Sequence, residues 1–233
     1  MRGFSKVLAV LLLGAGPGAA WADADHTQTL WTSWSNTTAL SRDWSLVSDV
    51  QLRSNDDAED LRNFIVRAGL SYALNPQLRM AAGFAYIDTY RPGSSTLTEH
   101  RSWQQLIASQ RIGGCTFSER LRLEQRFIER AGAPDTYSDR LRLQGRVTMP
   151  LQDRDKPLER GAFAFLQDEV FFHLSHRQRL NGKLFDQNRL YAGLGWRFSP
   201  KLDVEAGYLN QLVLGRSVDT QNHALQLQIS TKI

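Results

Sequence analysis

A histidine and a serine two positions apart have the spacing for nucleophilic chemistry. If their segment is a strand, His173 and Ser175 share one face, and the imidazole can take the hydroxyl proton. His100 and Ser102 form a second such pair. Because the chain has five histidines, such pairs also arise by chance, and a histidine and a serine at a strand end need no catalytic role. The pair therefore makes acyl transfer an alternative function for this protein and not the favoured one.

Arginines at every second position give a second chemical signal. Residues 120–127 and 140–147 alternate charged with apolar side chains, which in a strand separates them onto opposite faces. Such charges build a cross-strand ion-pair network, and rings of arginine also favour anions in a pore. The network is the favoured interpretation, and the two can coexist. Its expected members are Arg120, Arg122, Glu124, Arg126, Arg140, Arg142, Arg146, Glu169, Arg189, Arg197, Asp203 and Glu205.

Metal, cofactor and nucleic-acid chemistry have little support. His173 and His176 do not share a strand face, and no third ligand is evident. Cys115 is the single cysteine, so an intramolecular disulfide is excluded. The formal net charge is +4, but the arginines are interleaved with carboxylates and apolar residues rather than clustered. We therefore expect no metal, no cofactor and no nucleic-acid partner.

The first 22 residues predict a signal peptide. Arg2 and Lys6 form its basic start, residues 7–13 its apolar centre, and residues 20–22 a small-x-small cleavage site. The protein is therefore expected to be exported, with residues 23–233 forming one domain. No other apolar run approaches the length of a spanning helix.

The elements that must position these side chains are strands. After residue 23, segments of about 10–14 residues alternate apolar and polar side chains, which is typical of a transmembrane β-barrel. Short turns near residues 42, 76, 114 and 200 alternate with longer loops, one of them at residues 91–98; residues 150–161 would be an unusually long turn. We therefore predict a closed antiparallel transmembrane β-barrel with short periplasmic turns and longer extracellular loops.

The cost of charge in lipid orients the strands. A lipid-facing arginine at mid-membrane costs about 2–4 kcal/mol, so the two charged segments must face the lumen. A soluble β-sandwich would show the same alternation, but the signal peptide, the strand lengths and the turn pattern favour the barrel. The expected partners are therefore outer-membrane lipids.

The number of strands is harder to predict. Eleven segments can be counted, which gives a predicted range of 10–12 strands. A bacterial barrel with both ends in the periplasm needs an even number, so within that range we expect ten or twelve. The last strand has apolar residues at alternate positions up to Ile233, which predicts recognition by the barrel-insertion machinery. The oligomeric state is left open.

Five stretches resemble a family of bacterial outer-membrane barrels known as domain-of-unknown-function family 2490. They lie at residues 40–46, 99–105, 120–127, 186–195 and 207–211. The resemblance covers most of the mature chain through the order and spacing of short motifs. It implies an outer-membrane β-barrel and supplies no activity, substrate or site.

A local resemblance concerns the histidine and serine pair. His173 and Ser175, followed by Asn188 before an Arg-Leu-Tyr sequence, resemble the outer-membrane phospholipase A family, where the asparagine orients the histidine. The spacing here is one residue longer. The resemblance implies a lipid acyl hydrolase using these three residues. The leading hypothesis is a non-enzymatic outer-membrane barrel, either structural or a narrow or plugged pore, and the hydrolase is the alternative.

Overall fold

The computed structural model describes residues 24–132, 134–152 and 156–233, so the predicted signal peptide lies outside the described residues. The strands are long, as their alternation predicts. They are β1 (Asp25–Ala39), β2 (Trp44–Ser54), β3 (Leu61–Asn75), β4 (Leu78–Arg91), β5 (Ser94–Ile112), β6 (Cys115–Glu129), β7 (Thr136–Pro150), β8 (Gly161–His173), β9 (Phe185–Ser199), β10 (Leu202–Val213) and β11 (Thr220–Lys232). Two short 3-10 helices, η1 (Asp56–Ala58) and η2 (Arg177–Arg179), complete the described elements. Neither has the length or apolarity needed to cross a membrane.

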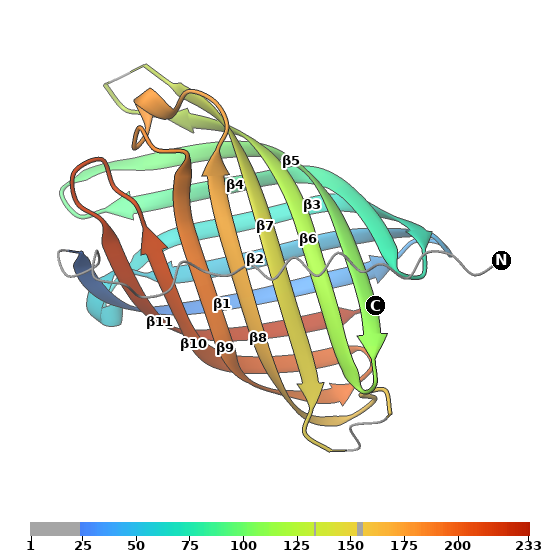
Figure 1. Ribbon diagram of the computed structural model, residues 1–233. Helices are drawn as coiled ribbons and strands as arrows, with labels where there is room; N and C mark the ends of the chain where they lie inside the picture. Colours follow the sequence, from blue (N-terminus) through green and yellow to red (C-terminus); the bar gives the residue numbers. More distant parts are fainter. Residues whose placement is uncertain (1–23, 133, 153–155) are drawn as a thin grey trace.

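The strands form one closed barrel, in which each strand pairs with the next and β11 returns to β1 (Figure 1). Consecutive strands are antiparallel, as expected, but β1 and β11 are parallel, from Asp25 opposite Thr220 to Thr37 opposite Lys232. The count of eleven lies within the predicted range, while the expectation of an even number is wrong. An odd number makes the first and last strands run in the same direction, so the start of β1 and the end of β11 lie at opposite ends of the barrel.

The connections at the two ends differ in length. Residues 40–43, 76–77, 113–114 and 200–201 make the short turns of one end, where β7 also connects to β8 over the longer distance in sequence that is expected from the alternation. Loops described at residues 55–60, 130–132, 134–135, 174–184 and 214–219 lie at the other end. The expected loop at residues 91–98 is wrong, because β4 and β5 continue to a two-residue turn in which Gly93 has φ +67°.

The outward face of the barrel is apolar. Phe84 is 74% exposed and Leu194 is 61% exposed, and many further leucines, isoleucines and aromatic residues are exposed in the same way. A soluble β-sandwich would bury these side chains, so this exposure contradicts that alternative. The charged halves of the alternating strands face the lumen, where two apolar clusters, one around Phe163 and Tyr191 and one around Trp103, also lie.

Glycines in the wall make room for aromatic rings in the lumen. Gly69 of β3 is opposite Gly83 of β4, and the Trp103 ring lies against both. A Cβ atom on Gly83 would overlap the carbonyl oxygen of Ala68 as well as the Trp103 ring. The close approach of strand backbone and ring therefore depends on the missing side chain.

We expect Gly83→Ala to destabilise the barrel by about 1–3 kcal/mol, because the added methyl group forces the neighbouring strand or Trp103 to shift. The matched control is Gly145→Ala, since a Cβ atom there meets nothing within 4 Å. Urea unfolding of the folded barrel in detergent, followed by tryptophan fluorescence, measures both. Equal stability of the two variants would contradict this account of the wall.

Candidate functional site

The two arginine-rich segments lie side by side as β6 and β7. Their register places Glu124 opposite Arg140, Arg122 opposite Arg142 and Arg120 opposite Gln144. Because strand side chains alternate, all of these residues point into the lumen, while the leucines between them point outward. The sequence predicts this orientation from the cost of charge in lipid, and the neighbouring register concentrates the charge on one wall.

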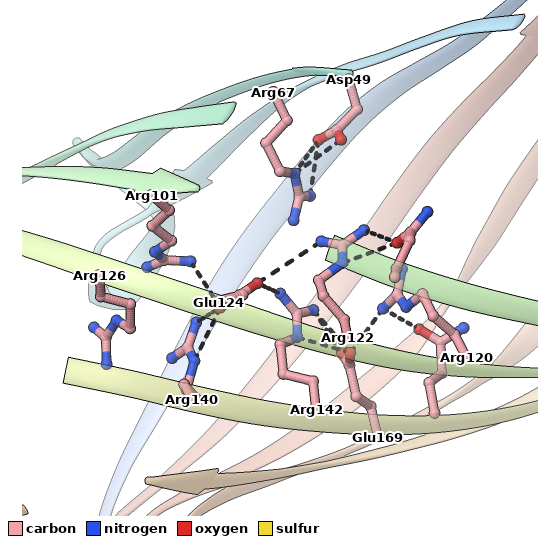
Figure 2. Close-up of polar contacts among 12 residues, drawn as sticks. Asp49, Arg67, Arg101, Arg120, Arg122, Glu124, Arg126, Arg140, Arg142 and Glu169 are labelled. Carbon is pink, nitrogen blue, oxygen red and sulfur yellow. Dashed lines mark hydrogen bonds and ion pairs between the residues drawn. The ribbon is translucent and has the colours of Figure 1, made fainter. Parts of the chain in front are cut away.

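Glu124 is the centre of the resulting ion-pair network (Figure 2). Arg140 donates to its Oε2 atom from Nε and Nη2, at 3.0 and 2.6 Å, and Arg142 donates to Oε1 from Nη1 at 2.6 Å. Guanidinium nitrogens of Arg101 and Arg122 lie 3.7 and 3.8 Å from its oxygens. The residue is only 1% exposed, so these arginines replace the water that the carboxylate would otherwise need.

Two further carboxylates extend the network. Glu169 of β8 accepts from Arg142 at 2.9 and 3.0 Å and from Arg120 at 2.7 Å, so Arg142 links it to Glu124. Glu99 of β5 accepts from Arg126 at 2.6 and 3.0 Å. Charge-assisted bonds of this two-pronged kind are the strongest that arginine makes, and they hold strands β5 to β8 in one register.

The remaining predicted members form separate contacts. Arg146 donates to Glu205 at 2.8 Å, and Arg197 donates to Asp203 at 2.7 and 2.6 Å. Arg189 forms no ion pair with a carboxylate among the described residues. The predicted set is therefore one connected cluster, two isolated pairs and one arginine outside the ion-pair network.

Several members of the lumen were not singled out by the sequence. Arg67 donates to Asp49 across β2 and β3 at 2.8 to 3.0 Å, and Arg101 pairs with Glu99. In the sequence, Asp49 and Arg67 already lie on the polar faces of their strands, so the alternation could have identified this pair. Asp186 had no such signal, because a bulge between Phe171 and Phe172 disturbs the alternation there.

The structure does not assemble the three residues of the hydrolase alternative. His173 Nε2 lies 3.1 Å from Asp186 on the lumen side, whereas the Ser175 hydroxyl donates to Asp139 at 2.8 Å. Asn188 donates to Asp168 at 2.6 Å on the outward face. The reason is that β8 ends at His173, so the strand period that would place Ser175 on the same face stops before it.

Two cavities occupy the lumen. One, of about 690 Å³, is lined by the arginine network and by residues towards the short-turn end. The other, of about 960 Å³, opens among the long loops and is also lined by Arg62, Arg130, Arg179 and Arg216. Arginines outnumber carboxylates in both linings. The residues that line both cavities, and so mark where they meet, are Trp31, Arg53, Asn63, Thr89, Arg126 and Arg140.

Among the described residues, no group of three or more histidine, cysteine, aspartate or glutamate side chains is arranged to hold a metal ion. A closed barrel with an apolar exterior and a charged, hollow lumen is the architecture of porin-like β-barrels. The chain belongs to the family described as "Protein of unknown function (DUF2490)", which it matches over residues 28–222.

One solved structure has a similar fold. The NanC porin superposes with a TM-score of 0.54 at 10% sequence identity, over 88% of this chain and 99% of the porin. The siderophore receptor PirA from Pseudomonas aeruginosa gives a TM-score of 0.31 at 14% identity, over 75% of this chain and 33% of the receptor. No curated protein matches the chain. At 10% identity, the likeness to the porin shows a similar fold alone.

We expect Glu124→Gln to cost about 3–5 kcal/mol of unfolding free energy, because each of the buried Arg140 and Arg142 loses one of its two carboxylate partners, leaving Arg140 only Asp186 and Arg142 only Glu169 among the described residues. A matched control is Asp219→Asn, since Asp219 pairs with Lys183 in an exposed site and such pairs contribute about 0–1 kcal/mol. Urea unfolding in detergent compares the two. A small loss for Glu124→Gln would show that the network does not support the barrel.

Proposed function

We propose that this protein is a non-enzymatic outer-membrane β-barrel that forms a narrow passage favouring small anions. The observation that carries the proposal is the meeting of two lumen cavities at a layer containing Arg53, Arg126 and Arg140. An ion crossing the barrel passes these guanidiniums at close range. Arginine-lined constrictions attract anions and repel cations, because little water is present to screen the charge.

The outer-membrane location is supported by the apolar exterior and by the barrel class. The exposed leucines and aromatic side chains then contact lipid. The end with short turns faces the periplasm, and the end with the wider cavity faces outward. The barrel-insertion machinery recognises β11, whose Leu225, Leu227 and Ile229 form an exposed apolar row.

A non-enzymatic role is favoured by the separate partners of the candidate catalytic groups. Proton transfer from Ser175 to His173 needs a distance of about 2.6–3.2 Å. The serine hydroxyl is already bonded to Asp139, and the histidine is paired with Asp186 in the lumen. The outer cavity is lined by arginines and polar side chains, which suits a hydrated ion better than an acyl chain.

Planar-bilayer recording of the purified barrel tests the proposal. We expect step currents, and in a potassium chloride gradient a reversal potential that shows chloride to be more permeant than potassium. Arg62→Glu and Arg179→Glu should each shift that potential towards potassium, because both residues line the outer cavity.

Arg177→Glu is the matched control, since Arg177 is exposed in the same loop as Arg179 and lines neither cavity. It should leave the reversal potential unchanged. A protein that produces no step currents, or that prefers potassium, would exclude the proposed passage.

A further inference from the structure

Two lumen arginines converge on one tryptophan ring. Trp31 of β1 points into the lumen, and the guanidinium carbon of Arg53 lies 3.8 Å from its ring centroid. The guanidinium carbon of Arg189, which comes from β9, lies 5.2 Å from the same centroid. The closure of β1 onto β11 brings these strands together, so two like charges share one aromatic surface.

These two guanidiniums have only neutral hydrogen-bond partners. Arg53 donates to the Gln51 side-chain oxygen at 2.8 Å, and its buried Nε has no hydrogen-bond partner among the described residues. Arg189 donates to Gln187 at 3.4 Å and, with the amide of Gln211 turned, to that residue as well. Neither guanidinium lies within ion-pair distance of a described carboxylate.

Arg122 shows the difference that a carboxylate makes. Like Arg53, it lies over a tryptophan, with its guanidinium carbon 5.0 Å from the Trp103 centroid, and it donates to a glutamine, Gln105. Unlike Arg53, it has an oxygen of Glu124 at 3.8 Å. Arg122 and Arg53 therefore have similar aromatic and amide neighbours, but among the described residues only Arg122 also has a carboxylate, that of Glu124, nearby.

We propose that Arg53 and Arg189, together with the Trp31 ring that both contact, form a binding subsite for an oxyanion, meaning the carboxylate or phosphate group of a small solute. The inference rests on the proposed anion passage and deepens it by naming a binding position and a ligand class. Both arginines line the inner cavity, and Arg53 and Trp31 also line the outer one, so the subsite lies where the two cavities meet.

The choice of an oxyanion follows from donor geometry. A guanidinium presents a planar fork that matches the paired oxygens of a carboxylate or a phosphate, while a spherical halide engages only part of that fork. The free Nε of Arg53 supplies a donor that no described side chain uses. A bound oxyanion would also neutralise two neighbouring positive charges, which is the strongest contribution available at this position.

Calorimetric titration of the folded, detergent-solubilised barrel in a Tris chloride buffer tests the subsite. Inorganic phosphate and acetate are titrated separately, and sodium chloride provides the halide comparison. We expect saturable binding of phosphate or acetate, with the tighter of the two identifying the preferred group, and no saturable binding of chloride. This measurement does not depend on conduction, so the subsite and the passage can fail independently.

Arg53→Gln and Arg189→Gln should each weaken binding by about tenfold or more, because each removes a charged donor. Arg53→Lys should lose less than Arg53→Gln, because it keeps the charge and loses the fork. Arg122→Gln is the matched control and should bind within about twofold of the unchanged protein, since Arg122 contacts Trp103, Gln105 and Glu124 and makes no hydrogen bond, ion pair or ring contact with the subsite residues. The urea midpoint of each variant confirms that it is folded.

Three results would overturn the subsite. The first is absence of saturable binding by the unchanged protein for both phosphate and acetate. The second is an Arg122→Gln variant that loses as much affinity as Arg53→Gln, since binding would then reflect the average potential of the lumen. The third is chloride binding of equal strength, which would show that the planar donor geometry is irrelevant.

Discussion

The pairing of buried arginines with buried carboxylates is the interaction on which this barrel depends. Glu124 and Glu169 each bind more than one arginine, and Arg142 bridges them. A carboxylate or guanidinium alone at such a site would be strongly unfavourable, whereas the connected set is compensated across β6, β7 and β8. The network therefore ties stability to register, because a one-residue slip of any of these strands would turn its charges towards lipid.

Barrel closure creates the second part of the lumen. Eleven strands require a parallel pairing of β1 with β11, and that pairing places Trp31 near side chains from both β2 and β9. Glycines such as Gly83 allow aromatic rings to lie close to the wall, so apolar clusters fill part of the interior. The space that remains is lined mainly by arginines, which links the packing of the wall to the proposed preference for anions.

Charge imbalance separates a structural role from a transport role. In a network built only for stability, each arginine would be expected to have a carboxylate partner, as Arg67 and Arg146 do. Arg53 and Arg189 have none among the described side chains; Arg53 lies where the two cavities meet, and Arg189 lines the inner one. The same lumen can thus be rigid at Glu124 and receptive to an external anion at Trp31.

The sequence by itself determined the barrel class and the face of most side chains, because a period of two and the cost of charge in lipid act within a single strand. It placed Arg120 and Leu121 on opposite faces, but it could not decide which carboxylate each arginine meets. Those contacts depend on the register of all eleven strands and on how the barrel closes. Only the tertiary structure paired His173 with Asp186 instead of Ser175, because β8 ends at His173 and a bulge shifts its register with β9. Only it brought Arg189 to the Trp31 ring beside Arg53, because β1 and β9 are far apart in the chain.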